Sequence, residues 1–312
     1  MNFDATSLSR RSFLARATLA SAGTALWPWR GLAAESTSSW PPPLAVFGKV
    51  FQSLKLTFEQ SAELTAAAGL DGVDCAARPG GEVLPERATE DLPRYSQALQ
   101  QHGVRLLLLT TAITSPATPH AEPLLRTARD LGVRYYRLGW WSYSGPRLPE
   151  SLRRDIQAQL KELAALNRQL GLCALIQNHS PGNRKYVGGN LAELPELLSD
   201  LDPEHVGVAF DIGHALIVHG DQWTEHFRRL SSHVKVVYVK DPDPAGKFVP
   251  FGQGRIRQTD FFKRLKGLGY AAPISVHIEF EWLAKDEPNP KAALLRALQT
   301  SGQTVRAWLA SA

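Results

Sequence analysis

The chain has 312 residues, of which 44% are hydrophobic and 21% are charged, which is typical of a globular protein with one large domain or two small ones. Its formal net charge is +5, but residues 1–34 carry four arginines against Asp4, so only +2 belongs to the rest of the chain. This near-neutral remainder contains no basic run, which gives no electrostatic basis for binding nucleic acid.

The N-terminal segment has the features of an export signal. Residues 9–14, SRRSFL, resemble the twin-arginine signal, a moderately apolar stretch at 17–27 follows, and the small residues GLAA at 31–34 suit cleavage. The apolar stretch is too short to form a stable membrane anchor. We therefore predict a twin-arginine signal peptide over 1–34, contact with the twin-arginine export machinery during secretion, and a periplasmic mature protein. Residues 35–43, ESTSSWPPP, are predicted to be a linker.

From residue 44 onward, strand-like and helix-like segments alternate. The expected strands are 44–50, 72–76, 104–110, 133–138, 172–177, 206–210, 234–239 and 273–279. The expected helices lie near 57–68, 88–102, 121–131, 149–170, 191–199, 222–230, 259–267 and 290–310.

This count and length match a (β/α)8 barrel, and most of the strands are the near-continuous apolar runs that a buried parallel sheet requires. The alternative, an open doubly wound sheet, requires a glycine-rich phosphate turn after the first strand. Residues 49–52, KVFQ, do not form such a turn. We predict a single (β/α)8 TIM barrel domain over 44–312, with no nucleotide cofactor.

Polar residues gather at the carboxyl ends of seven expected strands, where barrel enzymes place their chemistry. They are Lys49, Arg78, Arg137, Gln177 to His179, Asp211, Lys240, and His277 to Glu279. A solvated strand end or a helix cap explains any one of them, but seven at the same end of the barrel indicate a site.

Asp211 ends an apolar strand, and His214 follows three residues later. A buried carboxylate is costly unless it is paired or binds a metal. The sequence leaves three possibilities open for Asp211: a metal, a hydroxyl group of a substrate, or a structural ion pair.

Several segments resemble the sugar isomerase/epimerase superfamily with the xylose isomerase-like barrel. They are AFDIGHA at 209–215, the strand end VKD at 239–241 and VPFGQG at 249–254, while RPGG at 78–81 and QNHS at 177–180 resemble a sugar phosphate isomerase/epimerase-like subgroup. The resemblance covers roughly residues 44–283. It implies a small-molecule carbohydrate substrate and proton transfer through an enediolate, with a divalent metal held by Glu, Asp, His and Glu at the ends of strands five to eight.

This chain matches that ligand set only in part. Asp211 corresponds to the aspartate, whereas Gln177 replaces the first glutamate and Tyr238 the histidine. The second glutamate falls on His277, or on Glu279 if the strand shifts by two residues. Glutamine carries no charge and cannot act as a base. The metal candidates are Asp211, His277 and Gln177, and imidazole with carboxylate suits manganese, zinc or cobalt.

Strand geometry gives a second set of candidates. Residues two apart point to the same face of a strand, so His179, Lys240 and Glu279 form an outer layer beside Asp211 and His214. We predict His179 and Glu279 as the acid/base pair and Lys240 as the catalytic cation. The alternative is a ring of ion pairs that closes the barrel, such as Lys240 with Glu279.

The predicted substrate-binding residues are Lys49, Arg78, Arg137, Trp141 and His214. Arg137 suits anionic oxygens, together with Lys240. The aromatic faces of Trp140, Trp141 and Tyr143 either stack on a sugar ring at the mouth or pack under a neighbouring helix or loop.

The prediction for function is an exported sugar isomerase or epimerase that acts on a sugar or keto-sugar by proton transfer next to a carbonyl. The alternative is a non-catalytic periplasmic carbohydrate-binding barrel that has lost the usual catalytic glutamates. An endonuclease on the same barrel is disfavoured by the export signal and the near-neutral charge. Cys75 and Cys173 are predicted to be core residues rather than a disulfide.

Overall fold

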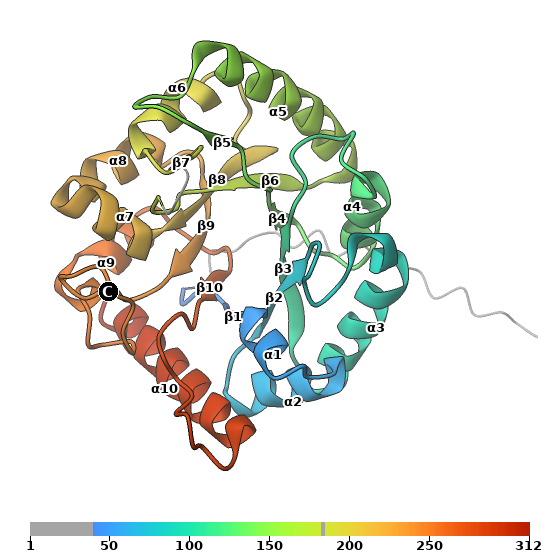
Figure 1. The fold of residues 1–312 in the computed structure, drawn as a ribbon, viewed down its shortest axis with the longest axis vertical. Coiled ribbons are helices and arrows are strands. Elements are labelled where there is room, and N and C mark those ends of the chain that lie inside the picture. Colours follow the sequence, from blue (N-terminus) through green and yellow to red (C-terminus); the bar gives the residue numbers. More distant parts are fainter. Residues whose placement is uncertain (1–39, 182–184) are drawn as a thin grey trace, which may run out of the picture. The chain divides into compact units, whose positions relative to one another are not determined.

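The computed structural model describes residues 40–181 and 185–312, and within them eight parallel strands close into a barrel (Figure 1). Around the barrel the order is β1 (Leu44–Phe47), β10 (Ile274–Val276), β9 (Val234–Val239), β8 (Val206–Asp211), β6 (Cys173–Gln177), β4 (Tyr135–Arg137), β3 (Arg105–Thr111) and β2 (Gly72–Ala77). Strand β1 pairs with both β2 and β10, which closes the barrel. The predicted (β/α)8 TIM barrel is confirmed.

Helices form a ring outside the strands (Figure 1). They are α1 (Lys49–Ser53), α2 (Phe58–Ala67), α3 (Ala88–Gln101), α4 (Ala121–Asp130), α5 (Glu150–Leu170), α6 (Leu194–Leu198), α7 (Ile212–His219), α8 (Trp223–Leu230), α9 (Phe261–Gly267) and α10 (Pro290–Ala310). Eight of them match the expected helices within a few residues. The short helices α1 and α7 were not predicted. Each follows a strand almost directly and, with five and eight residues, is too short to show a clear helical pattern of apolar residues.

The signal peptide predicted over 1–34 lies outside the described residues, as does the linker up to residue 39. None of the helices in the described part of the chain is long and apolar enough to cross a membrane.

The barrel interior changes from apolar to polar along the strands. Its lower part is a cluster of buried side chains: Ala45, Leu108, Cys173, Leu175, Ala209, Val236 and Tyr238. The residues one or two positions further along several strands are polar and equally buried. The interior alternation has a period of two, so these polar side chains lie further toward the carboxyl end than the apolar cluster. Both cysteines are free and buried, as predicted.

A small antiparallel sheet, β5 (Ser142–Tyr143) with β7 (Lys185–Tyr186), joins the loop after β4 to the loop after β6. It was not predicted, because each strand has only two residues and no apolar alternation. The sheet brings Tyr186 within 5.1 Å of Trp140, measured between ring centroids.

Candidate active site

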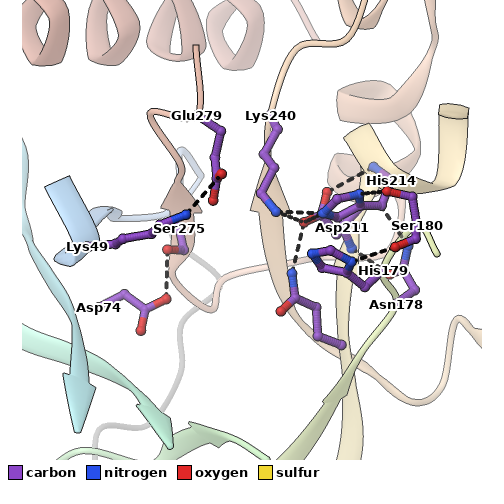
Figure 2. A network of polar contacts seen from close by, with 11 residues as sticks. Lys49, Asp74, Asn178, His179, Ser180, Asp211, His214, Lys240, Ser275 and Glu279 are labelled. Carbon is purple, nitrogen blue, oxygen red and sulfur yellow. Dashed lines mark hydrogen bonds and ion pairs between the residues drawn. The ribbon is translucent and has the colours of Figure 1, made fainter. Parts of the chain in front are cut away.

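Asp211 lies completely buried at the end of β8 (Figure 2). Its Oδ1 accepts the backbone N–H of His214 at 3.1 Å, which caps the start of α7. Its Oδ2 accepts Nε2 of Gln177 at 3.0 Å and lies 3.0 Å from Nζ of Lys240. A buried carboxylate is stable when both oxygens are paired. Asp211 therefore holds a helix terminus and a buried lysine.

Lys240 fixes the protonation of its neighbour. Its Nζ lies 2.7 Å from Nε2 of His214, and because an ammonium group only donates, this nitrogen accepts. The proton of the neutral ring is then on Nδ1, which donates to Oγ of Ser180 at 2.8 Å. Burial, and then the charge of Lys240, hold the pKa of His214 well below its usual value. The expected pairing of Lys240 with Glu279 is not formed; Lys240 pairs with Asp211.

Two residues, Asn178 and Gly213, hold the backbone of this network in place. The Asn178 side chain bonds both the N–H and the carbonyl oxygen of Asp211, at 2.7 and 2.8 Å. Gly213 allows the close approach of α7 to the end of β9, since a Cβ there would lie 2.4 Å from the Lys240 carbonyl oxygen. The sequence NH at 178–179 and DIGH at 211–214 thus build a rigid support for the lysine.

His179 lies half-buried against the same network, with its ring 3.9 Å from that of His214 and 5.2 Å from that of Trp140, between centroids. Its Nδ1 donates to the Ser180 carbonyl oxygen at 2.7 Å, which leaves Nε2 as the basic atom. Burial, and then the charge of Lys240, lower the pKa of His179 below its usual value. The ring is therefore neutral at pH 7 and available as a base.

Glu279 lies on another side of the mouth, 3.3 Å from Nζ of Lys49. Figure 2 shows this pair as a group separate from the Asp211 network. The Lys49 side chain is 56% exposed and that of Glu279 24%, so water screens their attraction. The pair holds Glu279 at the mouth of the barrel and leaves part of it accessible to water.

A second polar layer is centred on β2. Its carboxyl group is Asp74, which accepts hydrogen bonds from Oγ1 of Thr110 at 2.9 Å and from Oγ of Ser275 at 2.8 Å. Burial raises the pKa of Asp74 to about 6, although both hydroxyl bonds act in the opposite direction. Asp74 therefore changes charge close to neutral pH.

Three residues of this layer carry buried polar atoms that have no hydrogen-bond partner in the described chain: Nη1 of Arg137, the hydroxyl of Tyr238 and both ring nitrogens of His277. The His277 ring instead stacks on Phe47, 4.4 Å between centroids. An unpaired buried polar group costs about 1–3 kcal/mol. Such groups on β4, on β9 and directly after β10 indicate a place that a polar ligand or ordered water completes.

The structure distinguishes the two neighbouring tryptophans. The Arg137 guanidinium stacks on Trp140 at 4.6 Å, beside His179. Trp141 instead donates from Nε1 to Gln159 on α5 at 2.9 Å and packs against the main core. Trp140, and not the predicted Trp141, therefore lies beside the other site residues, because successive side chains point in opposite directions.

The remaining predicted residues surround the mouth. Arg78 is half-buried, 6.0 Å from the Phe47 ring centroid, and its charge adds to burial in lowering the pKa of Arg137 to about 10. Lys49 lies beside Glu279 and His214 beside Lys240. Lys49, Arg78, Arg137 and His214 are thus all found at the carboxyl end of the barrel.

Asp74 was missed in the sequence, and Glu82, noted after the second strand, was given no role. Glu82 accepts the backbone N–H of Ala76 and the hydroxyl of Tyr95, both at 3.1 Å, and burial raises its pKa to about 7. It lies against Gly48, where a Cβ would be 1.7 Å from its Oε2. The available signal was an acid inside the otherwise apolar strand GVDCAA at 72–77.

Comparison with known proteins identifies the family of this chain. The sequence model of the family described as Xylose isomerase-like TIM barrel matches residues 62–300. The chain belongs to this family. A curated relative, an uncharacterised protein of Methanocaldococcus jannaschii, is 26% identical over 121 residues, which is 38% of this chain. The match spans 40% of that relative's length.

Solved structures show the same fold. The 3-keto-D-glucoside 4-epimerase YcjR from E. coli has a TM-score of 0.65 at 13% identity, covering 87% of this chain and all of that one. The D-psicose 3-epimerase of Clostridium cellulolyticum H10, solved with D-tagatose, has a TM-score of 0.65 at 14% identity, covering 86% and 99%. The IolI protein, solved with a zinc atom, has a TM-score of 0.62 at 17% identity, covering 86% and 98%. At these identities the similarity shows the fold of a xylose isomerase-like barrel.

The donor set of this family member does not fit the divalent metal that related barrels often hold. Both oxygens of Asp211 are engaged, and the cation at its Oδ2 is the Lys240 ammonium. A carboxylate only accepts, so Gln177 turns its amide nitrogen, and not its oxygen, toward Asp211. Within the ranges described, no three His, Cys, Asp or Glu side chains gather as metal ligands. Asp211, His277 and Gln177, the predicted ligands, therefore do not form a metal site here.

Proposed function

We propose that this protein is a sugar isomerase or epimerase that moves a proton next to the carbonyl of a sugar or keto-sugar. The observation that carries the proposal is the contact of His179 with His214, 3.9 Å between ring centroids, because His214 in turn contacts the buried ammonium group of Lys240. A base next to a fixed cation is the pair that this chemistry requires, since removing the proton creates an enediolate oxygen.

The base in this proposal is Nε2 of His179. Its ring is oriented by the hydrogen bond from Nδ1 to Ser180 and by its contact with Trp140. Its lowered pKa keeps it unprotonated at neutral pH. It takes the proton from the carbon next to the carbonyl.

Lys240 supplies the positive charge. An ammonium group has three donors, and within the described chain Asp211 and His214 take two of them. The third is available to the carbonyl oxygen, whose negative charge grows as the proton leaves. Because the ammonium is 3% exposed and already oriented, little reorganisation is needed when that charge appears.

Glu279 is the second proton-transfer residue. It lies close enough to His179 for its charge to act on the pKa of that ring. Lys49 orients it from the other side. In an epimerisation His179 removes the proton from one face of the carbon, and Glu279, which is 24% exposed and takes up a proton from solvent beforehand, returns that proton to the opposite face.

Solvent deuterium exchange into a panel of sugars and keto-sugars, followed by mass spectrometry, tests the proposal. Wild type should incorporate deuterium next to the carbonyl, and His179→Gln and Glu279→Gln should each lose about 10²–10⁴-fold in rate. His102→Gln, at an exposed position after α3, is the matched control and should retain the wild-type rate. Exchange that persists in both site variants would contradict these roles.

The alternative is a carbohydrate-binding barrel without catalysis, which the replacement of the usual glutamates by Gln177 and His277 favours. Sugar-dependent thermal stabilisation without any deuterium exchange would select it.

We also propose that the protein is exported to the periplasm through the twin-arginine route, on the basis of Arg10 and Arg11 and the apolar stretch after them. Replacement of both arginines by lysine should leave the protein in the cytoplasmic fraction. Periplasmic protein from that double variant would contradict the proposal.

A further inference from the structure

Arg137 carries a buried positive charge that the protein itself does not pair. Its side chain is 3% exposed, and within the described residues its only hydrogen bond runs from Nη2 to the Thr111 carbonyl oxygen, at 3.4 Å. Its Nη1 is buried without a partner. A guanidinium group in this position is costly unless an anion completes it.

The nearby carboxyl group does not serve as that anion. Asp74 contributes an attraction to Arg137, but its two oxygens accept the hydroxyls of Thr110 and Ser275. The face of the guanidinium is fixed by Trp140 at 4.6 Å. The Arg137 guanidinium is therefore held in one orientation, and its Nη1 remains available to a ligand.

Arg78 adds a second positive charge. It is near enough to Arg137 to act on the pKa of that side chain, and no ion pair of Arg78 is formed within the described ranges. Two guanidinium groups repel each other, so their proximity costs free energy that a shared anion would offset. The unpaired hydroxyl of Tyr238 and the ring nitrogens of His277 add polar groups for hydroxyl groups of the same ligand.

We propose that Arg137, with Arg78 beside it, binds the carboxylate of a sugar acid, so that the substrate is an acidic sugar rather than a neutral one. A planar guanidinium fork matches a carboxylate with two parallel hydrogen bonds. A phosphate dianion is less suited to this place, because Asp74 lies in the same layer and repels the second charge. Assigning the acid as the substrate rests on the proposed function; the binding site does not.

Binding measurements on the full chain test the proposal without requiring turnover. The probes are D-glucuronate and D-gluconate, their neutral counterpart D-glucose, and D-glucose 6-phosphate, each followed by calorimetry and thermal shift. The acids should bind about 10–100-fold more tightly than D-glucose in wild type, since they alone supply the charged partner. This preference should disappear in Arg137→Met and weaken in Arg78→Met.

Two further variants keep the result interpretable. Arg137→Lys retains the charge without the fork and should lose most of the preference while remaining folded. Arg134→Met, at the opposite end of β4 where Arg134 pairs with Glu204 on the surface, is the matched control and should keep the full preference.

Equal affinity for D-glucose and the acids, absence of acid binding, or a preference that survives Arg137→Met would each overturn the proposal. Tighter binding of D-glucose 6-phosphate than of the acids would overturn the assignment to a carboxylate. Acid binding without deuterium exchange into any sugar would leave this site standing and contradict the proposed function. Exchange into neutral sugars without a preference for the acids would support the proposed function and contradict the carboxylate site.

Discussion

The two polar layers at the carboxyl end of the barrel differ in how completely their groups are paired. Around Asp211, both carboxylate oxygens, the Lys240 ammonium and the His214 ring have partners. In the second layer, Arg137, Tyr238 and His277 keep buried polar atoms without partners in the described chain. Within the described residues the first layer thus leaves one donor of the Lys240 ammonium open, whereas the second leaves several buried polar atoms unpaired.

This difference separates stability from binding. Removing one member of a paired buried network destabilises the folded protein, because the remaining charge is buried without a partner and without water. An unpaired buried group already costs free energy, so removing it stabilises the free protein. Substitutions in the two layers should therefore move stability in opposite directions.

The largest effect is expected for Asp211→Ala, which should lower the free energy of unfolding by about 3–5 kcal/mol because Lys240 then becomes an unpaired buried cation. Urea denaturation measures it. Asp200→Ala is the matched control, since Asp200 forms an exposed pair with Lys161, 3.4 Å apart; its loss should cost about 0–1 kcal/mol. The double variant Asp211→Ala with Lys240→Met should recover part of the loss, and similar losses for Asp211→Ala and Asp200→Ala would contradict the first layer's role.

The next effect concerns pH. Burial raises the pKa of Asp74 from 3.8 to about 6, so between these values the folded state binds more protons than the unfolded state. Its contribution to stability is therefore fully present below pH 3.8 and is lost as the pH rises through about 6, a change of about 3 kcal/mol. Asp74→Asn should remove this loss, measured as the difference from wild type in urea unfolding at several pH values. The opposite slope would contradict the raised pKa. Glu82→Gln should act in the same direction, with the window extending to about pH 7.

Arg137→Met should raise the free energy of unfolding of the ligand-free protein by about 1–2 kcal/mol, because an unpaired buried charge is replaced by an apolar chain of similar size. Thermal and urea unfolding without added sugar measure it. A loss of stability would show that Arg137 is already paired in the ligand-free protein. The two layers would then not differ in how completely their buried groups are paired.

Lys49→Met should change stability by less than about 1 kcal/mol, because its pair with Glu279 is largely exposed to solvent. The rate of deuterium exchange should nevertheless fall, since Glu279 loses the contact that orients it. An unchanged rate would assign the pair to the surface rather than to the site.

Removal of metal should have no effect on thermal unfolding or on deuterium exchange, because Lys240 already neutralises Asp211. Dialysis against a chelator, with elemental analysis before and after, measures this. Near-stoichiometric manganese, zinc or cobalt that disappears in Asp211→Ala would contradict the structural argument.

The sequence predicted the barrel because its signals are local. Apolar runs of strand length alternate with helical segments, and their order was enough to define the strands and most helices. The small sheet of β5 and β7 was not predictable, because two-residue strands carry no periodic pattern. The position of Asp211 at the end of a strand was predictable from the sequence, whereas Glu279, predicted in the same outer layer as His179 and Lys240, lies in a separate group beside Lys49.

The sequence predicted the pairing partners of these residues less well than their positions. Lys240 was expected to pair with Glu279 in one interpretation, and it pairs with Asp211. Trp141 was preferred to Trp140, because the sequence does not say which of two adjacent rings faces the mouth. Asp74 was overlooked, although an acid within an apolar strand was a usable signal, and Glu82 after that strand was given no role.

By itself, then, the sequence determined the order of the strands, the approximate position of each strand end and which side chains share a face, since these depend on neighbours in the chain. The tertiary structure decided which of them meet across the barrel, because that depends on the register of strands distant in sequence. Gln177, Asp211 and Lys240 come from three different strand ends, and only the closed barrel brings a carboxylate to a lysine rather than to a metal.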